Sequence, residues 1–414
     1  MGLASLRTIF AGLIVSACLV ELLIILHSTR TFVANESTVT LPSGNGHQLV
    51  SRGQLRFSVI QKTPNLTETR PASKTDAVLA VQVSASPAGN DTISTQRYID
   101  KVWKGFSGVW VSNETRKTGV RRKLNSVMDV KEFAVMTKRF TKIGQTIQFG
   151  ITHASRNMTK DVYTSLPEQS PFANATLQRC IVVGNGGILT NSRCGKEIDS
   201  ADFVFRCNTP PLREYGEDVG TKTSITSINP HSVIGAKYKR LVDQGQRAKF
   251  LNDMKKYGQL LVPLYGVASG YTVSASALKL LQTNSNASTP KKMLIINPDH
   301  FRATGGLWTE MGLKKRLTTG FYLASLALSV CGSVELYGFW PFPTDTVNNP
   351  VPYHYYGKEK ISKGVHNFNL EFDLLYQLHT DGVLRMHVGS CVSTTKPGKT
   401  RLSKWYNKDE HKLS

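Results

Sequence analysis

Short apolar runs rich in β-branched residues alternate with helical patterns through the second half of this 414-residue chain. The runs, in order from residue 180 to residue 388, are CIVVGN, DFVFRCN, TSITSIN, QLLVPLY, KKMLIIN, SVELYGF and VLRMHV. Helical patterns lie between them, in VSASALKLLQ, TTGFYLASLALSVC and NLEFDLLYQLHT. Strands separated by helices imply βαβ units. The pattern therefore predicts an α/β domain with a mainly parallel sheet.

Three side chains directly follow predicted strands: Asn185, Asn208 and Trp340. Ligands of open parallel sheets bind at the carboxyl ends of the strands. We therefore expect these three residues to lie on one rim of the sheet.

The first predicted strand runs into four turn residues, Gly184 to Gly187. Glycines allow backbone N–H groups to approach a ligand closely, and phosphate is their usual ligand, although many glycine-rich strand ends are only turns. A dinucleotide fingerprint would need a third glycine at position 189, which is Leu189, and an acidic residue placed for the ribose. This disfavours an oxidoreductase with a nucleotide cofactor.

The amino-terminal region predicts a membrane anchor. Residues 9–26 are apolar except Ser16 and Glu21, and this length can span a bilayer. No small-x-small cleavage site follows in LHSTRTFVANES, so a signal anchor over residues 8–27, after a cytoplasmic tail of residues 1–7, is preferred to a cleaved signal peptide.

Seven N-x-S/T sequons, most of them between residues 35 and 174, indicate that the bulk of the chain lies in the secretory lumen. They begin at Asn35, Asn65, Asn90, Asn113, Asn157, Asn174 and Asn286.

Residues 30–96 are rich in Ser, Thr, Asn and Pro, with almost no aromatic residues. Such a segment cannot bury enough apolar surface to fold, which predicts a disordered stem over residues 28–97. Tyr98, Trp103, Phe106 and Trp110 then appear together, so the folded domain is expected to cover residues 98–395, followed by a basic tail of residues 396–414.

The net charge is +22, spread over the chain rather than concentrated in one block. Nucleic acid is the generic partner of a basic chain, but a luminal protein rarely meets it. Anionic small molecules, sialylated or sulfated glycans and membrane surfaces fit better, and part of the charge serves solubility.

Six cysteines are too few for a disulfide scaffold, and no C-x-x-C pair suggests zinc. In an oxidising lumen, the five outside the predicted span allow two internal bridges at most. Cys180, Cys194, Cys331 and Cys391 lie in separate elements and are available for pairing. Cys207 lies inside an apolar strand and is the expected buried free thiol.

Longer stretches resemble a known family. CIVVGNGGILTNSRCGKEIDSADFVFRCNTPPLREYGEDVGTKTSITSINP resembles the large motif of animal sialyltransferases, and LTTGFYLASLALSVCGSVELYGFWPF resembles their small motif. YHYYG and HNFNLE resemble the two short motifs that follow, in the family's order and spacing. GNGGIL, FRCNTPP and the terminal cysteine resemble the α-2,8-sialyltransferase branch.

The resemblance implies a single Rossmann-like α/β domain, a variant of the GT-A type, in a type II Golgi membrane protein. It implies inverting transfer of sialic acid from CMP-sialic acid to a sialylated glycolipid or glycoprotein, without a metal; the sequence agrees in having no D-x-D motif. It also implies disulfides joining Cys180 to Cys331 and Cys194 to Cys391. A homo-oligomer is left open.

The chemistry needs a group that stabilises the departing phosphate and a base for the acceptor hydroxyl. Thr318, Thr319 and Gly320 begin an apolar helix and suit a phosphate, with an ordinary N-cap as the alternative. By resemblance His366, five residues before Glu371, is the general base, and His354 donates to the phosphate. His379 and His387 are expected to be structural.

By the same resemblance, Asn185 and Asn208 contact the nucleotide, Trp340, Pro341 and Phe342 line the cytidine pocket, and Tyr353 joins the substrate-binding residues. The chain departs from the family at Thr318, where a serine is usual, and at Gly357, where this branch usually has an acidic residue. The second departure concerns the local loop or the fit of the acceptor.

A catalytically silent glycan-binding protein of the same fold is the alternative function, although such a protein could lose His366 or Asn208 and both are present. A polysialylating enzyme would be expected to carry a dense basic stretch before the small motif. Only Lys314, Lys315 and Arg316 stand there, so we expect one or a few sialic acids to be added.

Overall fold

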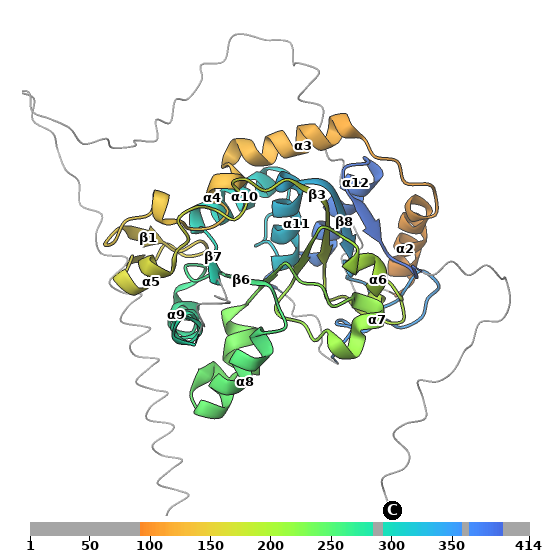
Figure 1. The fold of residues 1–414 in the computed structure, drawn as a ribbon. Helices are drawn as coiled ribbons and strands as arrows, with labels where there is room; N and C mark the ends of the chain where they lie inside the picture. Colours follow the sequence, from red (N-terminus) through yellow and green to blue (C-terminus); the bar gives the residue numbers. More distant parts are fainter. Residues whose placement is uncertain (1–91, 285–292, 358–363, 392–414) are drawn as a thin grey trace, which may run out of the picture. The chain divides into compact units, whose positions relative to one another are not determined.

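The computed structural model describes residues 92–284, 293–357 and 364–391 (Figure 1). The predicted anchor, nearly all of the predicted stem, the basic tail and four sequons (Asn35, Asn65, Asn90 and Asn286) lie outside these ranges. Within them, no helix has both the length and the apolar character needed to cross a bilayer.

A seven-stranded sheet forms the centre of the fold, and all of its neighbouring strands are parallel. Each strand falls within one of the predicted apolar runs or extends it by a few residues, so the predicted parallel α/β sheet is confirmed. In spatial order the strands are β7 (Met293–Ile295), β6 (Gln259–Val262), β5 (Ile225–Ser227), β4 (Phe203–Arg206), β3 (Leu177–Val183), β8 (Cys331–Tyr337) and β9 (Arg385–His387).

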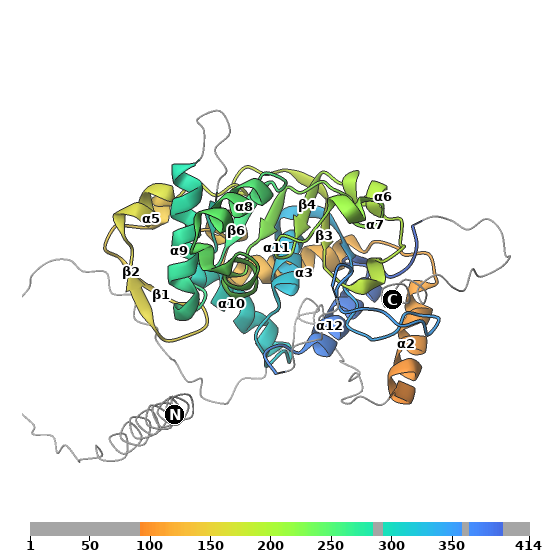
Figure 2. The same cartoon turned by 90° about the horizontal axis from the view of Figure 1, so that it is seen from below.

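Both faces of the sheet are buried, as expected for parallel strands. In β3, Cys180 and Val182 belong to one apolar core, and Ile181 and Val183 belong to the other. The first core contains side chains of α2 (Thr92–Phe106), α3 (Glu114–Val127), α4 (Val130–Phe133), α10 (Pro298–Glu310), α11 (Thr319–Val330) and α12 (Phe368–Thr380). The second contains side chains of α5 (Lys160–Ser165), α6 (Gly195–Asp199), α7 (Gly216–Val219), α8 (Gln244–Met254) and α9 (Ala268–Thr283). Figure 2 shows these helices around the strands.

Helix α11 is the most deeply placed helix, because every residue from Phe321 to Val330 is buried. A helix that is apolar on all sides is stable only when it is covered on all sides. It passes directly into β8 at Cys331, so the predicted small motif is one buried helix followed by one central strand.

The direction in which strands are added changes at β3. The chain continues from β3 to β4, β5, β6 and β7 on one side, and then returns to place β8 and β9 on the other side. Such a reversal opens a crevice at the carboxyl ends of the two strands where it occurs. This position lies at the ends of β3 and β8, next to the end of β4.

The region before β3 contains elements that the hydrophobic pattern did not predict. Helix α2 begins at Thr92 and includes residue 98, the expected start of the domain. Its buried side chains include Ile99 and Val102. A short antiparallel hairpin follows later, formed by β1 (Thr146–Gln148) and β2 (Ser155–Asn157).

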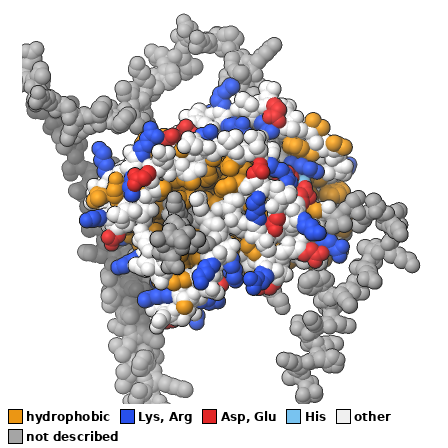
Figure 3. All heavy atoms as spheres, in the orientation of Figure 1, with side chains coloured by type: hydrophobic (Ala, Val, Ile, Leu, Met, Phe, Trp, Pro, Cys, Tyr) orange, Lys and Arg blue, Asp and Glu red, His pale blue; other side chains and the backbone are white. Residues whose placement is uncertain are grey.

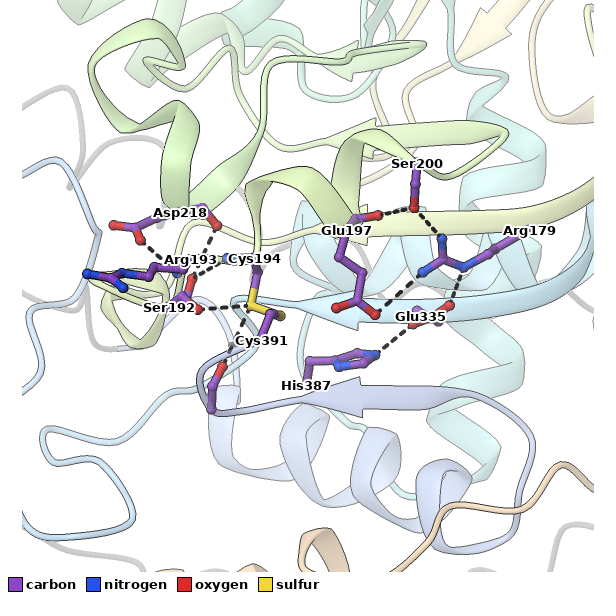
Figure 4. The surroundings of a disulfide bond; sticks show 11 residues. Arg179, Ser192, Arg193, Cys194, Glu197, Ser200, Asp218, Glu335, His387 and Cys391 are labelled. Atoms are coloured by element: carbon purple, nitrogen blue, oxygen red, sulfur yellow. Dashed lines mark hydrogen bonds and ion pairs between the residues drawn. A yellow bond between two sulfur atoms is a disulfide. The ribbon is translucent and has the colours of Figure 1, made fainter. Parts of the chain in front are cut away.

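Both implied disulfides are present. Cys180 in β3 is bonded to Cys331 at the start of β8, and Cys194 is bonded to Cys391. The second bridge ties the segment before α6 to the chain beyond β9 (Figure 4). Cys207 is free and buried, as predicted, and burial raises the pKa of its thiol to about 12.

A charged network lies beside the second disulfide (Figure 4). Glu335 accepts from Arg179 Nε at 2.5 Å and lies 2.7 Å from His387 Nε2, and Glu197 lies 3.7 Å from the Arg179 guanidinium. The two carboxylates and His387 could each supply one metal ligand. Arg179 already compensates the carboxylates, so the cluster acts as an ion-pair network that joins β3, β8 and β9, and His387 has a structural role.

Candidate active site

An open pocket lies at the change of strand direction. Its walls come from the ends of β3, β4 and β8, the first turn of α11, the segment after residue 352 and the start of α12. The predicted site residues that line it are Asn185, Asn208, Thr318, Thr319, Gly320, Trp340, Pro341, Tyr353, His354 and His366. The structure therefore brings together every predicted catalytic and substrate-binding residue except Phe342.

In the glycine turn at residues 184–187, backbone N–H groups form hydrogen bonds within the protein. Gly184 N–H donates to Tyr337 O at 2.7 Å, and Gly186 N–H donates to Gly338 O at 3.0 Å. A Cβ on Gly187 would collide with the carbonyl of Pro352. The expectation that this turn presents its N–H groups to a ligand is therefore wrong for Gly184 and Gly186, because they are bonded to the last residue of β8 and to the residue that follows it. The glycines instead allow that part of the chain to approach closely.

The same turn anchors the segment that carries His354. Gly186 pairs with His354 in an antiparallel bridge, and Tyr355 N–H donates to Asn185 O at 3.0 Å. The His354 ring is stacked on Tyr353, with centroids 4.2 Å apart, and lies over Tyr356 at 5.1 Å. Main-chain pairing and ring stacking thus fix the position of His354 at the pocket wall.

Two asparagines form the floor of the pocket. The Asn185 amide N–H group donates to Cys207 O at 3.0 Å, whereas its Oδ1 atom is buried without a partner among the described residues. Asn208 has a positive φ of 60°, a conformation that asparagine tolerates better than most residues, and its Oδ1 accepts from Ser227 Oγ at 3.2 Å. Buried polar atoms without partners are costly, so Asn185 Oδ1 is suited to accept a hydrogen bond from a ligand.

The first turn of α11 faces this pocket. Thr318 is its N-cap, because Thr318 Oγ1 accepts from Phe321 N–H at 3.1 Å. The N–H groups of Thr319 and Gly320 have no hydrogen-bond partner within the described part of the chain. A helix start with free N–H groups is suited to an anion. The capping and phosphate-binding interpretations of this motif are therefore compatible.

Glu371 holds the start of α11 against α12, an interaction that the sequence did not predict. Its carboxyl group accepts from Thr318 N–H at 2.7 Å and from Thr318 Oγ1 at 2.5 Å. The side chain is 4% exposed, and burial raises its pKa to about 7 despite these two hydrogen bonds. The spacing of Glu371 from His366 is visible in the sequence, but only the packing of α12 on α11 reveals the partner of Glu371.

We expect Glu371 to make the stability of the domain depend on pH. Its pKa is raised from 4.5 to about 7 on folding, so its stabilising contribution is full below pH 4.5 and is lost as the pH rises through 7. The loss should reach about 3 kcal/mol. Glu371→Gln keeps a donor and an acceptor for Thr318 but cannot ionise, so the variant should lose this pH dependence.

Denaturant unfolding of the native chain and Glu371→Gln between pH 5 and pH 8 measures this effect. Glu310→Gln on the exposed end of α10 is the matched control and should follow the native curve. Parallel native and Glu371→Gln curves over this range would contradict the assignment.

His366 is oriented by the backbone. Its Nδ1 lies 2.8 Å from Arg316 O, and because a carbonyl oxygen only accepts, Nδ1 carries the proton and Nε2 keeps its lone pair. The Phe368 ring meets the imidazole edge at 5.7 Å. Burial lowers the pKa of His366 below its ordinary value, in spite of the hydrogen bond to Arg316. The residue is thus a neutral imidazole whose Nε2 can accept a proton.

Trp340 and Phe342 occupy different positions. Trp340 lines the pocket, and its indole N–H donates to Thr344 O at 2.7 Å. Phe342 lies in the core, packed on Trp340 at 5.0 Å and on Phe372 at 4.9 Å, and is not among the residues that line the pocket. Phe342 therefore supports the Trp340 ring from the core.

The structure also places His379 and three of the sequon asparagines. His379 is buried, its Nδ1 accepts from Met386 N–H at 3.1 Å, and burial lowers its pKa to about 4. Three sequon asparagines within the described residues, Asn113, Asn157 and Asn174, are exposed. Asn113 Oδ1 caps α3, which leaves its amide nitrogen for a glycan.

Comparison with known proteins connects this pocket to one family. Residues 127–383 match the profile of "Glycosyltransferase family 29 (sialyltransferase)". The chain is 39% identical over 300 residues to "Alpha-N-acetylneuraminide alpha-2,8-sialyltransferase" of Xenopus tropicalis, covering 70% of this chain and 85% of that protein. It is 31% identical over 341 residues to "Alpha-2,8-sialyltransferase 8F" of Mus musculus, covering 80% and 84%.

A solved structure of a mammalian sialyltransferase, in complex with Gal-beta-1-3GalNAc-ortho-nitrophenol, is 18% identical to the chain. It covers 77% of this chain and 97% of that one, with a TM-score of 0.39.

Proposed function

Because the chain belongs to glycosyltransferase family 29, the sialyltransferases, we propose that it transfers sialic acid from CMP-sialic acid to the 8-hydroxyl group of a sialylated glycolipid or glycoprotein. The matched family model covers more than half of the chain, and the relatives named above are α-2,8-sialyltransferases. The resemblance seen in the motifs and these comparisons therefore agree on an α-2,8-sialyltransferase.

The reaction exchanges one bond at the anomeric carbon of the donor sugar. The bond from C2 to the phosphate oxygen breaks, CMP leaves with both electrons, and the acceptor oxygen forms a new bond to C2 on the opposite face. The proton of the acceptor hydroxyl goes to a base. The transition state resembles an oxocarbenium ion, so the site must accept negative charge on the phosphate and positive charge on the sugar.

One observation carries the assignment of roles: His366 keeps a basic Nε2 in the same pocket as an anion-binding helix start. His366 then takes the proton of the acceptor hydroxyl, while the N–H groups of Thr319 and Gly320, together with His354, receive the charge of the phosphate. Asn185 and Asn208 hold the nucleotide, and Trp340, Pro341 and Tyr353 form its apolar wall.

In this arrangement the protein itself supplies hydrogen-bond donors to the phosphate. We therefore propose that transfer needs no metal ion. The test is transfer to a sialylated glycolipid and a sialylated glycoprotein from CMP-sialic acid, with and without EDTA. We expect the same rate in both conditions, and product that is released by a sialidase able to cleave α-2,8 linkages.

Two results would contradict this proposal in different ways. Loss of activity in EDTA, restored by a divalent cation, would reject only the metal-independent mechanism. Binding of sialylated glycans with neither transfer nor hydrolysis of CMP-sialic acid would instead support the silent glycan-binding alternative.

The location in the cell is also a proposal: a single-pass type II protein of the Golgi membrane with its domain in the lumen. Two disulfides and three exposed sequon asparagines support an oxidising, glycosylating compartment. The predicted anchor that would tether it lies outside the described residues.

A further inference from the structure

A second hollow adjoins the pocket on the side of β5, β6 and β7. The two share Asn208, Asn229 and Thr319 in their linings, so they form one continuous depression. The walls of the second hollow are mostly apolar and aromatic, with Tyr265, Phe301 and Tyr322 among them. Of the residues proposed to contact the donor, only Asn208 and Thr319 line this hollow, both where it meets the first pocket, so the rest of the hollow is available for another part of the substrates.

Among the described residues, Arg316 is the one Lys or Arg side chain that lines this hollow, and His231 lines it as well. Arg316 is exposed, and within the described part of the chain its guanidinium makes no ion pair or side-chain hydrogen bond. The protein around it lowers its pKa by burial, with no carboxylate acting against that effect. Its neighbours Lys314 and Lys315 are exposed and line neither depression. A partly desolvated guanidinium without a counter-charge is suited to bind an anion.

The position of Arg316 relative to the base limits what this anion can be. The Arg316 carbonyl accepts the Nδ1 proton of His366, so the guanidinium and the basic Nε2 belong to directly connected residues. In a sialylated acceptor, the 8-hydroxyl and the carboxylate belong to the same sugar. When the 8-hydroxyl lies at His366 Nε2, the carboxylate of the same sugar therefore lies no farther from His366 than the width of one sugar residue.

We propose that Arg316 recognises the carboxylate of the acceptor's terminal sialic acid, with that sugar seated in the hollow between β5, β6, β7 and α11. This inference rests on the proposed function and names the residue that sets its substrate class. The aromatic walls contact the N-acetyl methyl group and the carbon skeleton, and the planar guanidinium pairs with both carboxylate oxygens. A neutral terminal sugar leaves Arg316 unpaired and binds less well.

The test compares the KM of two acceptors with two proteins, the native chain and the variant Arg316→Gln. The acceptors are a disaccharide with a terminal sialic acid and its methyl ester, in which the carboxyl group is uncharged and carries one added methyl group. The native full-length chain should use the ester with a KM raised roughly 10- to 100-fold, because a charge-assisted hydrogen bond is lost. Arg316→Gln should show this higher KM with both acceptors and should distinguish between them little.

Several readouts separate this role from a structural one. The hydrogen bond to His366 uses the Arg316 backbone, so Arg316→Gln should keep kcat within a few-fold, the CMP dissociation constant and the rate of CMP-sialic acid hydrolysis. Arg316→Lys should recover part of the preference for the acid. Lys315→Ala removes a neighbouring charge outside the hollow and is the matched control, which should behave as the native chain does.

If the native chain uses acid and ester equally well, or if Arg316→Gln keeps the native preference, the role of Arg316 is rejected while the proposed function stands. If the native chain hydrolyses CMP-sialic acid but transfers to no sialylated acceptor, the proposed function itself fails.

Discussion

Replacing His366 with Ala should lower the rate of sialyl transfer by about 100-fold or more, because the acceptor hydroxyl loses its base. Binding of CMP should remain close to native, since the contacts proposed for the nucleotide come from Asn185, Asn208 and the start of α11. The measurements are kcat, the CMP dissociation constant and the hydrolysis of CMP-sialic acid without an acceptor. Hydrolysis should survive better than transfer, because departure of the phosphate does not need His366 to take the acceptor proton.

His354→Ala is the contrasting variant. Its partner is a phosphate that is already charged in the bound donor, so this substitution should weaken CMP binding as well as turnover. Equal effects of the two substitutions on transfer, hydrolysis and CMP binding would reject the separate roles. Native transfer by His366→Ala would reject the mechanism.

The pH profile provides a further check on the same residue. His366 is active when neutral, so kcat rises with pH through its pKa. Burial lowers this pKa, so the rise should lie below the ordinary histidine value of about 6.5. A midpoint well above that value would indicate that His366 is not the base or that its site is more exposed.

Removing the disulfide between Cys180 and Cys331 should have a large effect on stability. The two residues are 151 positions apart in sequence, and the bridge joins the two central strands β3 and β8. Loss of a native disulfide typically costs roughly 2–5 kcal/mol, and bridges that close long loops lie at the upper end. We therefore expect the double variant Cys180→Ala, Cys331→Ala to unfold at a much lower denaturant concentration.

Cys207→Ala is the control for this measurement. It removes a buried thiol of similar size but leaves both bridges intact, so its cost should be about 1 kcal/mol. If the double variant and Cys207→Ala unfolded at the same denaturant concentration, the central disulfide would contribute little to stability.

The sequence predicted the elements whose hydrophobic pattern is strong. The central strands β3, β4, β6 and β8 carry buried apolar residues because both faces of the sheet are covered, and α11 is apolar because it is buried on all sides. Helix α3 was missed because only Lys117, Val120 and Leu124 are buried in its 14 residues. The hairpin of β1 and β2 was missed because each strand has three residues, too few for an alternation to be recognised.

The positions of site residues at strand ends could be predicted from the sequence. The positions that depend on packing between helices could not. Asn185, Asn208 and Trp340 meet because parallel strands end at the same edge. Phe342 was misplaced because the chain after β8 is irregular and its side chains do not alternate. Glu371 and Arg316 take their positions from the packing of α12 and the segment before α11, which no local pattern specifies.

The position of β3 between β4 and β8 has a consequence for biosynthesis. β8 begins 148 residues after β3 ends, so at about 5–20 residues per second the ribosome needs roughly 7 to 30 seconds to deliver it. During that time the Cys180 thiol has no native partner, and Cys194 and Cys207 emerge long before Cys331 does. Early oxidation would therefore join the wrong cysteines. If the chain matures in the proposed secretory compartment, we expect its folding to need an isomerase that can reopen such bonds.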